Sequence, residues 1–381
     1  MSPNRLLHSR SARWAAPVGV VVVVAGAIAV TSAAAGAAPA LPARTAADLL
    51  VAVGGAHPQP FSGTVVETAS LGLPSLPSSA STSSWTDLLS GSHSMRIWVA
   101  SAHQVRLALI GETDESDVIL NGSTVWTWNS ATNTVGKETL PPRREKSPAA
   151  APSAAASPLD PRVAAQEVLA ALDPTTAVRV DGTARVAGRP VYELVLAPRD
   201  AASLIGQVRI ALDAGTWMPL RVQVFARGAS APAFDTGFVT LSYATPPGSV
   251  FTFTPPRGAT VTSGVAGMPS VLRHGTPAVA PAGARSTRTA GAQPTVVGSG
   301  WTSVAVLHGV SLSDLGGSGG GGTLAEVNQA AVPVQGSFGS GRLLTTALVN
   351  VLALNDGRVL IGAVTPQRLE QVAAAPAATT R

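Results

Sequence analysis

The side chains that could support catalysis are few and poorly placed in this chain. Gly316-Gly-Ser318-Gly-Gly320 fits the Gly-x-Ser-x-Gly pattern of a nucleophilic serine. Such a serine needs a strand before it and a helix after it, whereas Ser318 lies inside a run of glycines, which favours a linker. The same run lacks the Lys-Ser/Thr pair that completes a phosphate-binding loop.

Metal chemistry has no better support. Five of the six histidines lie beyond the N-terminal segment, at His57, His93, His103, His274 and His308, without the close spacing of a metal site. Asp114-Glu-Ser-Asp117 offers oxygen ligands but lacks the glycine and the ligand spacing of a calcium loop, so we interpret it as an exposed turn between strands. We therefore expect no metal, no cofactor and no enzymatic activity, with a Ser318 hydrolase as the third-ranked alternative.

Large apolar side chains gather instead in strand-like segments. Trp126 and Trp128 are two residues apart, so they share a face of a strand. The candidate residues for an apolar ligand site are Met95, Ile97, Val99, Trp126, Trp128, Val222 and Val224. Two interpretations are open: these side chains pack as a core against helices, or they line a cavity for a lipid-like ligand.

The elements that must position them begin with a helix and a meander. Thr45-Ala-Ala-Asp48 has capping-box spacing and precedes an apolar stripe, which predicts a helix. Residues 61–67 alternate like a strand, and residues 94–140 are typical of an antiparallel meander. In the meander Asn121-Gly122 marks a tight hairpin turn.

The second half of this region repeats the pattern. Residues 141–158 form an Ala/Pro/Ser-rich tract that predicts a flexible insertion, and Asp160-Pro161 begins a second predicted helix. Five strand-like runs follow, at 177–186, 190–197, 206–213, 219–227 and 236–243. Two helices are few for about nine strands, so we expect an α+β fold in which a strongly curved antiparallel sheet partly wraps around them.

The N-terminus predicts export. Residues 1–14 contain three arginines and no acid, and an apolar run with small residues follows up to Ala40, as in a signal peptide. The alternative is an uncleaved membrane anchor. Without those arginines, 23 basic residues face 21 acidic ones, and no basic run is interleaved with aromatics, so we expect no nucleic-acid partner.

The composition also sets the domain boundaries. We expect a signal peptide or anchor at 1–40, a ligand-binding domain at 41–261, a Pro/Gly/Ala/Ser-rich linker at 262–295 and a small α/β domain at 296–381. In the last domain, apolar runs at 343–354 and 358–364 flank a turn, and a helix begins at Pro366. The chain has no cysteine, so no disulfide or lipid-bearing thiol is expected.

Several segments carry a resemblance to a known family. They are Val186-Ala-Gly-Arg-Pro190, Leu194-Val-Leu-Ala-Pro-Arg-Asp200, Leu212-Asp-Ala-Gly-Thr-Trp-Met-Pro-Leu-Arg221, Phe251-Thr-Phe-Thr-Pro-Pro-Arg-Gly-Ala-Thr-Val261 and, more loosely, Gly357–Leu369. They resemble the MucB/RseB family of periplasmic sigma-factor regulators, whose N-terminal domain has the fold of the lipoprotein carrier LolA. The resemblance implies an unclosed antiparallel β-barrel with a helical lid, followed by a small C-terminal domain.

Two functions follow as expectations. The first is an extracytoplasmic binding protein that holds an acyl chain or lipoprotein in an apolar half-barrel. The second is a regulator of an envelope-stress sigma factor that binds a membrane anti-sigma factor. The C-terminal domain favours the regulator, because simple carriers of this fold have one domain.

Overall fold

Two β-sheets contain most of the regular structure. The structure is a computed structural model that describes residues 39–72, 88, 90–140, 175–264, 295–309 and 330–375. Within these ranges there are a twelve-stranded and a six-stranded sheet, the α-helices α2 (Ala46–Gly54) and α6 (Pro366–Ala374), and two short 3-10 helices, η3 (Gly248–Phe251) and η4 (Gly300–Thr302).

The large sheet is built from two runs of antiparallel strands. Its strands are β1 (Phe61–Ala69), β2 (Gly91–Ser101), β3 (Gln104–Ile110), β4 (Glu115–Asn121), β5 (Thr124–Asn129), β6 (Thr134–Thr139), β7 (Thr176–Val186), β8 (Arg189–Pro198), β9 (Ile205–Asp213), β10 (Pro219–Ala226), β11 (Phe234–Ser242) and β12 (Thr260–Ser263). They lie in the order β12-β6-β5-β4-β3-β2-β1-β11-β10-β9-β8-β7. Only β12 and β6 pair in parallel among these described strands.

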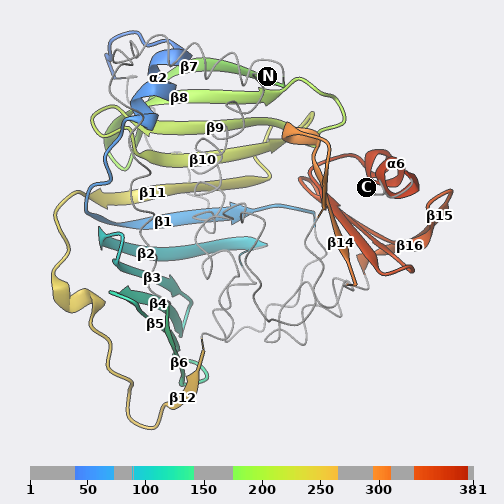
Figure 1. The fold of residues 1–381 in the computed structure, drawn as a ribbon. Helices are drawn as coiled ribbons and strands as arrows, with labels where there is room; N and C mark the ends of the chain where they lie inside the picture. The colour runs from blue at the N-terminus through green and yellow to red at the C-terminus, as the bar shows by residue number, and fades with distance from the viewer. Residues whose placement is uncertain are drawn as a thin grey trace, which may run out of the picture.

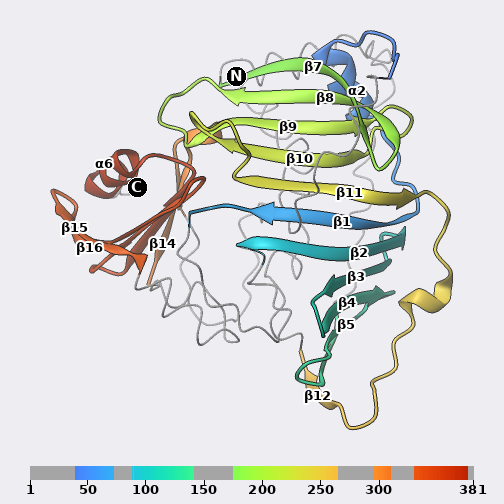
Figure 2. The same cartoon turned by 180° about the vertical axis from the view of Figure 1, so that it is seen from behind.

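This strand order leaves the sheet open. β1 lies in the middle, because β11 returns to pair with it on one side while β2 pairs with it on the other. The two edge strands, β7 and β12, lie at opposite ends, and the sheet bends between them without closing (Figure 1). The view from behind shows the same bend, with β3–β6 turned away from the plane of β7–β11 (Figure 2). The predicted curved, unclosed antiparallel sheet is confirmed.

Local sequence signals explain where these elements begin and turn. In α2 the Thr45 hydroxyl accepts the Asp48 N–H at 3.2 Å and the Asp48 carboxylate accepts the Thr45 N–H at 3.0 Å, which is the predicted capping box. Gly122 has a φ of 63° in the β4–β5 turn, the left-handed conformation that a two-residue hairpin requires. The predicted helix at Asp160 lies outside the described residues.

The small sheet follows a simpler plan. Its strands are β13 (Thr295–Val297), β14 (Val304–His308), β15 (Val332–Gly336), β16 (Gly339–Thr345), β17 (Asn350–Leu354) and β18 (Arg358–Gly362), in the order β13-β14-β18-β17-β16-β15. The predicted helix is α6, whose Leu369 and Val372 pack in one cluster with Leu352 and Leu360. The predicted small α/β C-terminal unit is therefore present.

The apolar run 343–354 contains the end of β16, a turn and all of β17. The Thr346 hydroxyl accepts the N–H groups of Leu348 and Val349 and so stabilises a turn between them. Asn350 is buried and donates a hydrogen bond from Nδ2 to the Val364 carbonyl at 2.8 Å, which fixes the start of β17.

The two sheets are in direct contact. Ser203 and Val364 form an isolated β-bridge, and the Leu204 N–H donates to the Ala363 carbonyl at 2.9 Å. Trp301 of η4 donates from Nε1 to the Thr176 hydroxyl at 2.7 Å. The small sheet therefore packs against the end of the large sheet where β7 begins and β8 leads into β9 (Figure 1).

Candidate apolar ligand site

We call the face of the large sheet on which α2 packs the inner face. Leu49 of α2 packs in one cluster with Val222. Val222 lies opposite Thr236, and Thr236 lies opposite Glu67 on β1. Residues directly opposite one another in paired strands share a face, as do residues two apart on one strand. Glu67 and Val65 therefore also belong to the inner face.

Five of the seven candidate residues lie on this face. Val65 is opposite Met95 on β2, and Ile97 and Val99 follow on the same side of that strand. Val224 follows Val222 on β10. Met95, Ile97 and Val222 are buried, and Val99 and Val224 are half-buried.

Trp126 and Trp128 lie on the opposite, outer face. The row of opposite residues that contains Trp126 runs through β4 and β3 to Trp98, which lies between Ile97 and Val99 and so points the other way. The two rings pack against Phe253, with centroid distances of 5.6 and 6.2 Å. The structure thus places five candidates on one face, in two separate clusters: Met95, Ile97 and Val99 in one, and Val222 and Val224 in the other. The two tryptophans belong to neither cluster.

Residues 243–259 connect β11 to β12, and we call them the strap (Figure 1). Through Phe253 the strap packs on both tryptophans. Phe251 in the strap is buried. Under the strap, Arg106 forms an ion pair with Asp117 at 2.6 Å, and its guanidinium lies 5.6 Å from the centroid of the Trp98 ring. The outer face at β3–β5 is therefore a second packed layer, which the sequence pattern did not predict.

Burial changes the ionisation of Asp117. Burial is the largest influence and raises its pKa to about 7, the charge of Arg106 lowers the pKa, and the neighbouring Glu115 raises it. Arg106 also lies within 3.5 Å of Glu115. This cluster links β3 to β4 below the strap.

The inner face contains one acidic residue that the sequence analysis did not single out. Glu67 is 0% exposed, and both of its carboxyl oxygens are buried with no hydrogen-bond partner among the described residues. Burial raises the pKa of Glu67 to about 8. The sequence does contain a sign that Glu67 is unusual: it lies between Val65 and Ala69 on β1, where strand alternation predicts an apolar side chain.

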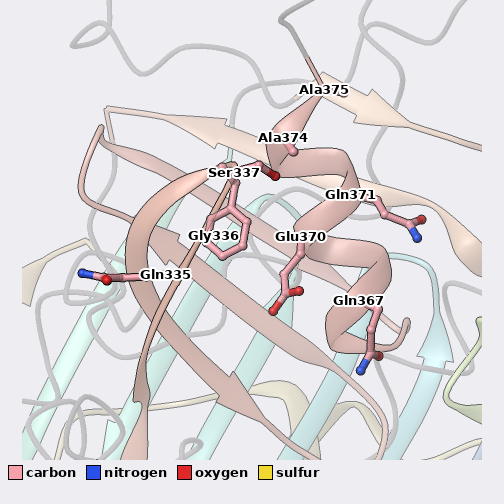
Figure 3. A pocket seen from close by; sticks show the side chains of 9 residues that line it. Gln335, Gly336, Ser337, Gln367, Glu370, Gln371, Ala374 and Ala375 are labelled. Atoms are coloured by element: carbon pink, nitrogen blue, oxygen red, sulfur yellow. The ribbon is translucent and has the colours of Figure 1, made fainter.

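A hollow also lies on the small sheet, away from the inner face. It has a volume of about 580 Å³ and lies between the β15–β16 hairpin and α6, lined by Gln335, Gln367 and Glu370 together with Phe338 and Ala374 (Figure 3). It is broad and open. The five candidates of the inner face are instead covered, as in a packed core.

The remaining chemical candidates do not gather into a site within the described ranges. Within the described ranges, no three His, Asp or Glu side chains come together as a metal site. Asp114 lies in the turn before β4, where its carbonyl accepts the Gly111 N–H at 2.9 Å. The prediction of an exposed turn over 114–117 is wrong for the rest of the segment, because β4 begins at Glu115 and Asp117 is 1% exposed. Ser318 and His274 lie outside the described residues.

The N-terminal prediction lies outside the described ranges as well. Residues 1–38 are not among the described residues. Among the residues that are described, no helix has the length and apolar character needed to cross a bilayer.

No protein-family model and no curated protein matches the chain. Solved structures do. The Pseudomonas aeruginosa MucA/MucB complex matches with a TM-score of 0.42 and 16% identity, over 86% of this chain and 96% of that chain. A LolA-superfamily protein of Nitrosomonas europaea matches with a TM-score of 0.22 and 11% identity, over 55% and 99%. A putative outer-membrane lipoprotein-sorting protein domain of Vibrio parahaemolyticus has a TM-score of 0.19 and 11% identity, over 51% and 89%. These matches describe a likeness of fold.

Proposed function

We propose that this protein is an extracytoplasmic binding protein that holds an acyl chain, free or attached to a lipoprotein, against the inner face of the large sheet. The observation that carries the proposal is that Met95, Ile97 and Val99 of one apolar cluster and Val222 and Val224 of another share one face of a sheet that does not close. An antiparallel sheet can keep one face against apolar partners while its other face is solvated.

The energetics favour an apolar ligand. Each Å² of apolar surface that an acyl chain removes from water contributes roughly 25 cal/mol, less the cost of ordering the chain. In this structure the inner face is covered, so the ligand must displace part of the cover. We therefore expect affinities of micromolar order, which correspond to about 8 kcal/mol.

The test uses the exported, full-length protein. Lipid extraction followed by mass spectrometry reports a bound acyl species, and a polarity-sensitive fluorescent fatty acid reports binding. Val99→Trp and Val224→Trp add volume at half-buried positions of the inner face and should block the probe. Val239→Trp is the matched control, because Val239 is 37% exposed. No lipid and no probe binding by the parent protein would contradict the proposal.

A second candidate function is regulation through a membrane anti-sigma factor. The observation that favours it is the small sheet, which ends in an exposed edge strand. Val332 on β15 is 62% exposed, and an edge strand can pair with a strand of another protein. Pull-down of the extracytoplasmic segment of a neighbouring anti-sigma factor, with Val332→Asp as the disrupting variant, distinguishes this function from lipid binding.

A further inference from the structure

Glu67 has an unusual position for an acidic residue. It lies on β1, the strand that joins the two halves of the large sheet, and it occupies the inner face between Val65 and Ala69. Val65 is 1% exposed and Ala69 is 4% exposed. The carboxyl group is therefore in the middle of the apolar surface proposed to hold the acyl chain.

The two flanking strands place few polar groups beside it. Glu67 lies opposite Thr236 on β11 and opposite His93 on β2. His93 is the titratable one of these two, and its Nε2 lies 2.9 Å from the Ser90 carbonyl oxygen. On α2, the acidic residue Asp48 is bound to Thr45 at the start of its own helix.

An unpartnered carboxyl group in such a place is costly. A buried polar group without a hydrogen bond destabilises the folded state, and a buried charge does so much more. Burial keeps Glu67 protonated at neutral pH, with a pKa of about 8. In that form it has one O–H donor and acceptor capacity that the described residues do not use.

We propose that the Glu67 carboxyl group is the polar anchor of the ligand site and donates a hydrogen bond to the carbonyl oxygen of an acyl ester or fatty acid. The proposal rests on the proposed function and adds a chemical requirement to it. The ligand is a chain that is apolar along its length and has one carbonyl group, which enters the inner face. A pure hydrocarbon of the same length lacks the acceptor.

The test compares two uncharged fluorescent probes of equal length, a methyl ester and a hydrocarbon, because neither of them titrates. The variants are Glu67→Gln, which keeps a neutral donor, and Glu67→Leu, which has none. We expect Glu67→Leu to weaken the ester about three- to tenfold, the size of one neutral hydrogen bond, and to leave the hydrocarbon unchanged. Glu67→Gln should bind the ester as the parent protein does.

The pH dependence is a second readout. The parent protein should lose ester affinity as pH rises through about 8, because the carboxylate cannot donate. Glu67→Gln should bind the ester equally at pH 6 and pH 9, with the hydrocarbon as the control for changes in fold. Thermal unfolding of each variant verifies that it is folded.

The outcomes separate the two proposals. Equal ester affinity in the parent protein and Glu67→Leu, together with a flat pH profile, would overturn the anchor while acyl binding stands. If neither probe binds the parent protein, both proposals fail. Loss of both probes in a folded Glu67→Gln would also overturn the anchor, because that variant retains the donor.

Discussion

Trp126 on β5 packs against Phe253 in the strap, with their ring centroids 5.6 Å apart and their planes at 52°. Lys137 on β6 lies on the same tryptophan, with its ammonium nitrogen 4.8 Å from the ring centroid. The contact between Trp126 and Phe253 joins the strap, which follows β11, to the β2–β6 meander. The strap therefore helps hold together the two halves of the open sheet that otherwise meet at β1.

Removing the strap's aromatic rings should destabilise the large sheet. Phe251 is 1% exposed, so Phe251→Ala should lower the free energy of unfolding by about 3–5 kcal/mol, as for other buried phenylalanines. Phe253→Ala should cost less, about 1–3 kcal/mol, because its ring is half-buried. Denaturant unfolding measures both. Val261→Ala, at a 54% exposed position of β12, should change the free energy by less than about 0.5 kcal/mol.

The turn between β9 and β10 should depend on Asp213. Its carboxylate accepts the N–H groups of Gly215 and Thr216 at 2.8 and 2.9 Å and is paired with Arg189. Burial acts to raise its pKa, but the hydrogen bonds from Arg189 and the turn, with the charge of Arg189, hold the pKa below its ordinary value. We expect Asp213→Asn to destabilise the protein by about 1–3 kcal/mol, less than for a fully buried pair, because Arg189 is 35% exposed.

The pH profile gives this prediction a second measurement. A lowered folded-state pKa contributes stability above the unfolded pKa and loses it as pH falls through the folded value. The difference in the free energy of unfolding between the parent protein and Asp213→Asn should therefore be largest at pH 6 and decrease below about pH 4. Asp356→Asn, at an exposed ion pair, is the control and should have little effect at either pH. A difference that stays constant down to pH 2 would contradict the assignment.

Glu67 should give stability a pH dependence opposite in sign to that of Asp213. Its folded-state pKa of about 8 lies above its ordinary value of 4.5, so stability is full below about pH 4.5 and falls as pH rises to about 8. Each pKa unit corresponds to about 1.4 kcal/mol. Asp117, with a pKa of about 7, contributes in the same window.

Substitutions separate the contributions of Glu67 and Asp117 to the pH dependence of stability. Glu67→Gln should remove part of the decrease in the free energy of unfolding between pH 4.5 and pH 8, and Asp117→Asn should remove another part. Chemical unfolding at several pH values measures both slopes. If Glu67→Gln has the same slope as the parent protein, Glu67 is not neutral at pH 6 and the anchor proposal loses its donor.

Much of the fold was predictable because strand and turn signals are local. Asn121-Gly122 and the Thr45–Asp48 capping box each act within a few residues, and both formed as predicted. The side of the sheet on which a residue lies is a different matter. Alternation shows that Trp126 and Trp128 share a face, but only the register between strands shows that this face is not the one of Ile97.

The features that the sequence pattern did not predict depend on contacts between distant segments of the chain. The strap packs on the tryptophans, but a loop without periodic apolar residues gives no sign of what it will pack on. Glu67 broke the apolar alternation on β1, and that signal was available. Its burial depends on neighbours from β2 and β11, which the sequence of β1 alone does not specify.

The contact between the two sheets should depend on Trp301. Its Nε1 donates to the Thr176 hydroxyl at 2.7 Å, and its ring packs at the edge of the cluster around α2. The other described hydrogen bonds between the sheets are backbone ones, from Leu204 and Thr365 to the facing chain and from Ala347 to Leu71, and each contributes only about 1 kcal/mol. Trp301→Ala should therefore release the small sheet from the large one, whereas Trp301→Phe, which keeps a ring, should weaken the contact less.

Limited proteolysis followed by size-exclusion chromatography measures this effect. We expect cleavage within the predicted linker, beyond the end of β12 at Ser263, to yield a fragment of about residues 45–264. In the parent protein the two fragments should elute together, because the bonds from Trp301, Leu204 and Thr365 remain. In Trp301→Ala they should elute apart, with the large fragment still cooperatively folded. Co-elution of the Trp301→Ala fragments would show that the backbone bonds around Ser203 and Val364 and between Ala347 and Leu71 are sufficient to hold the sheets together. First cuts within β7–β11 would contradict the domain boundary itself.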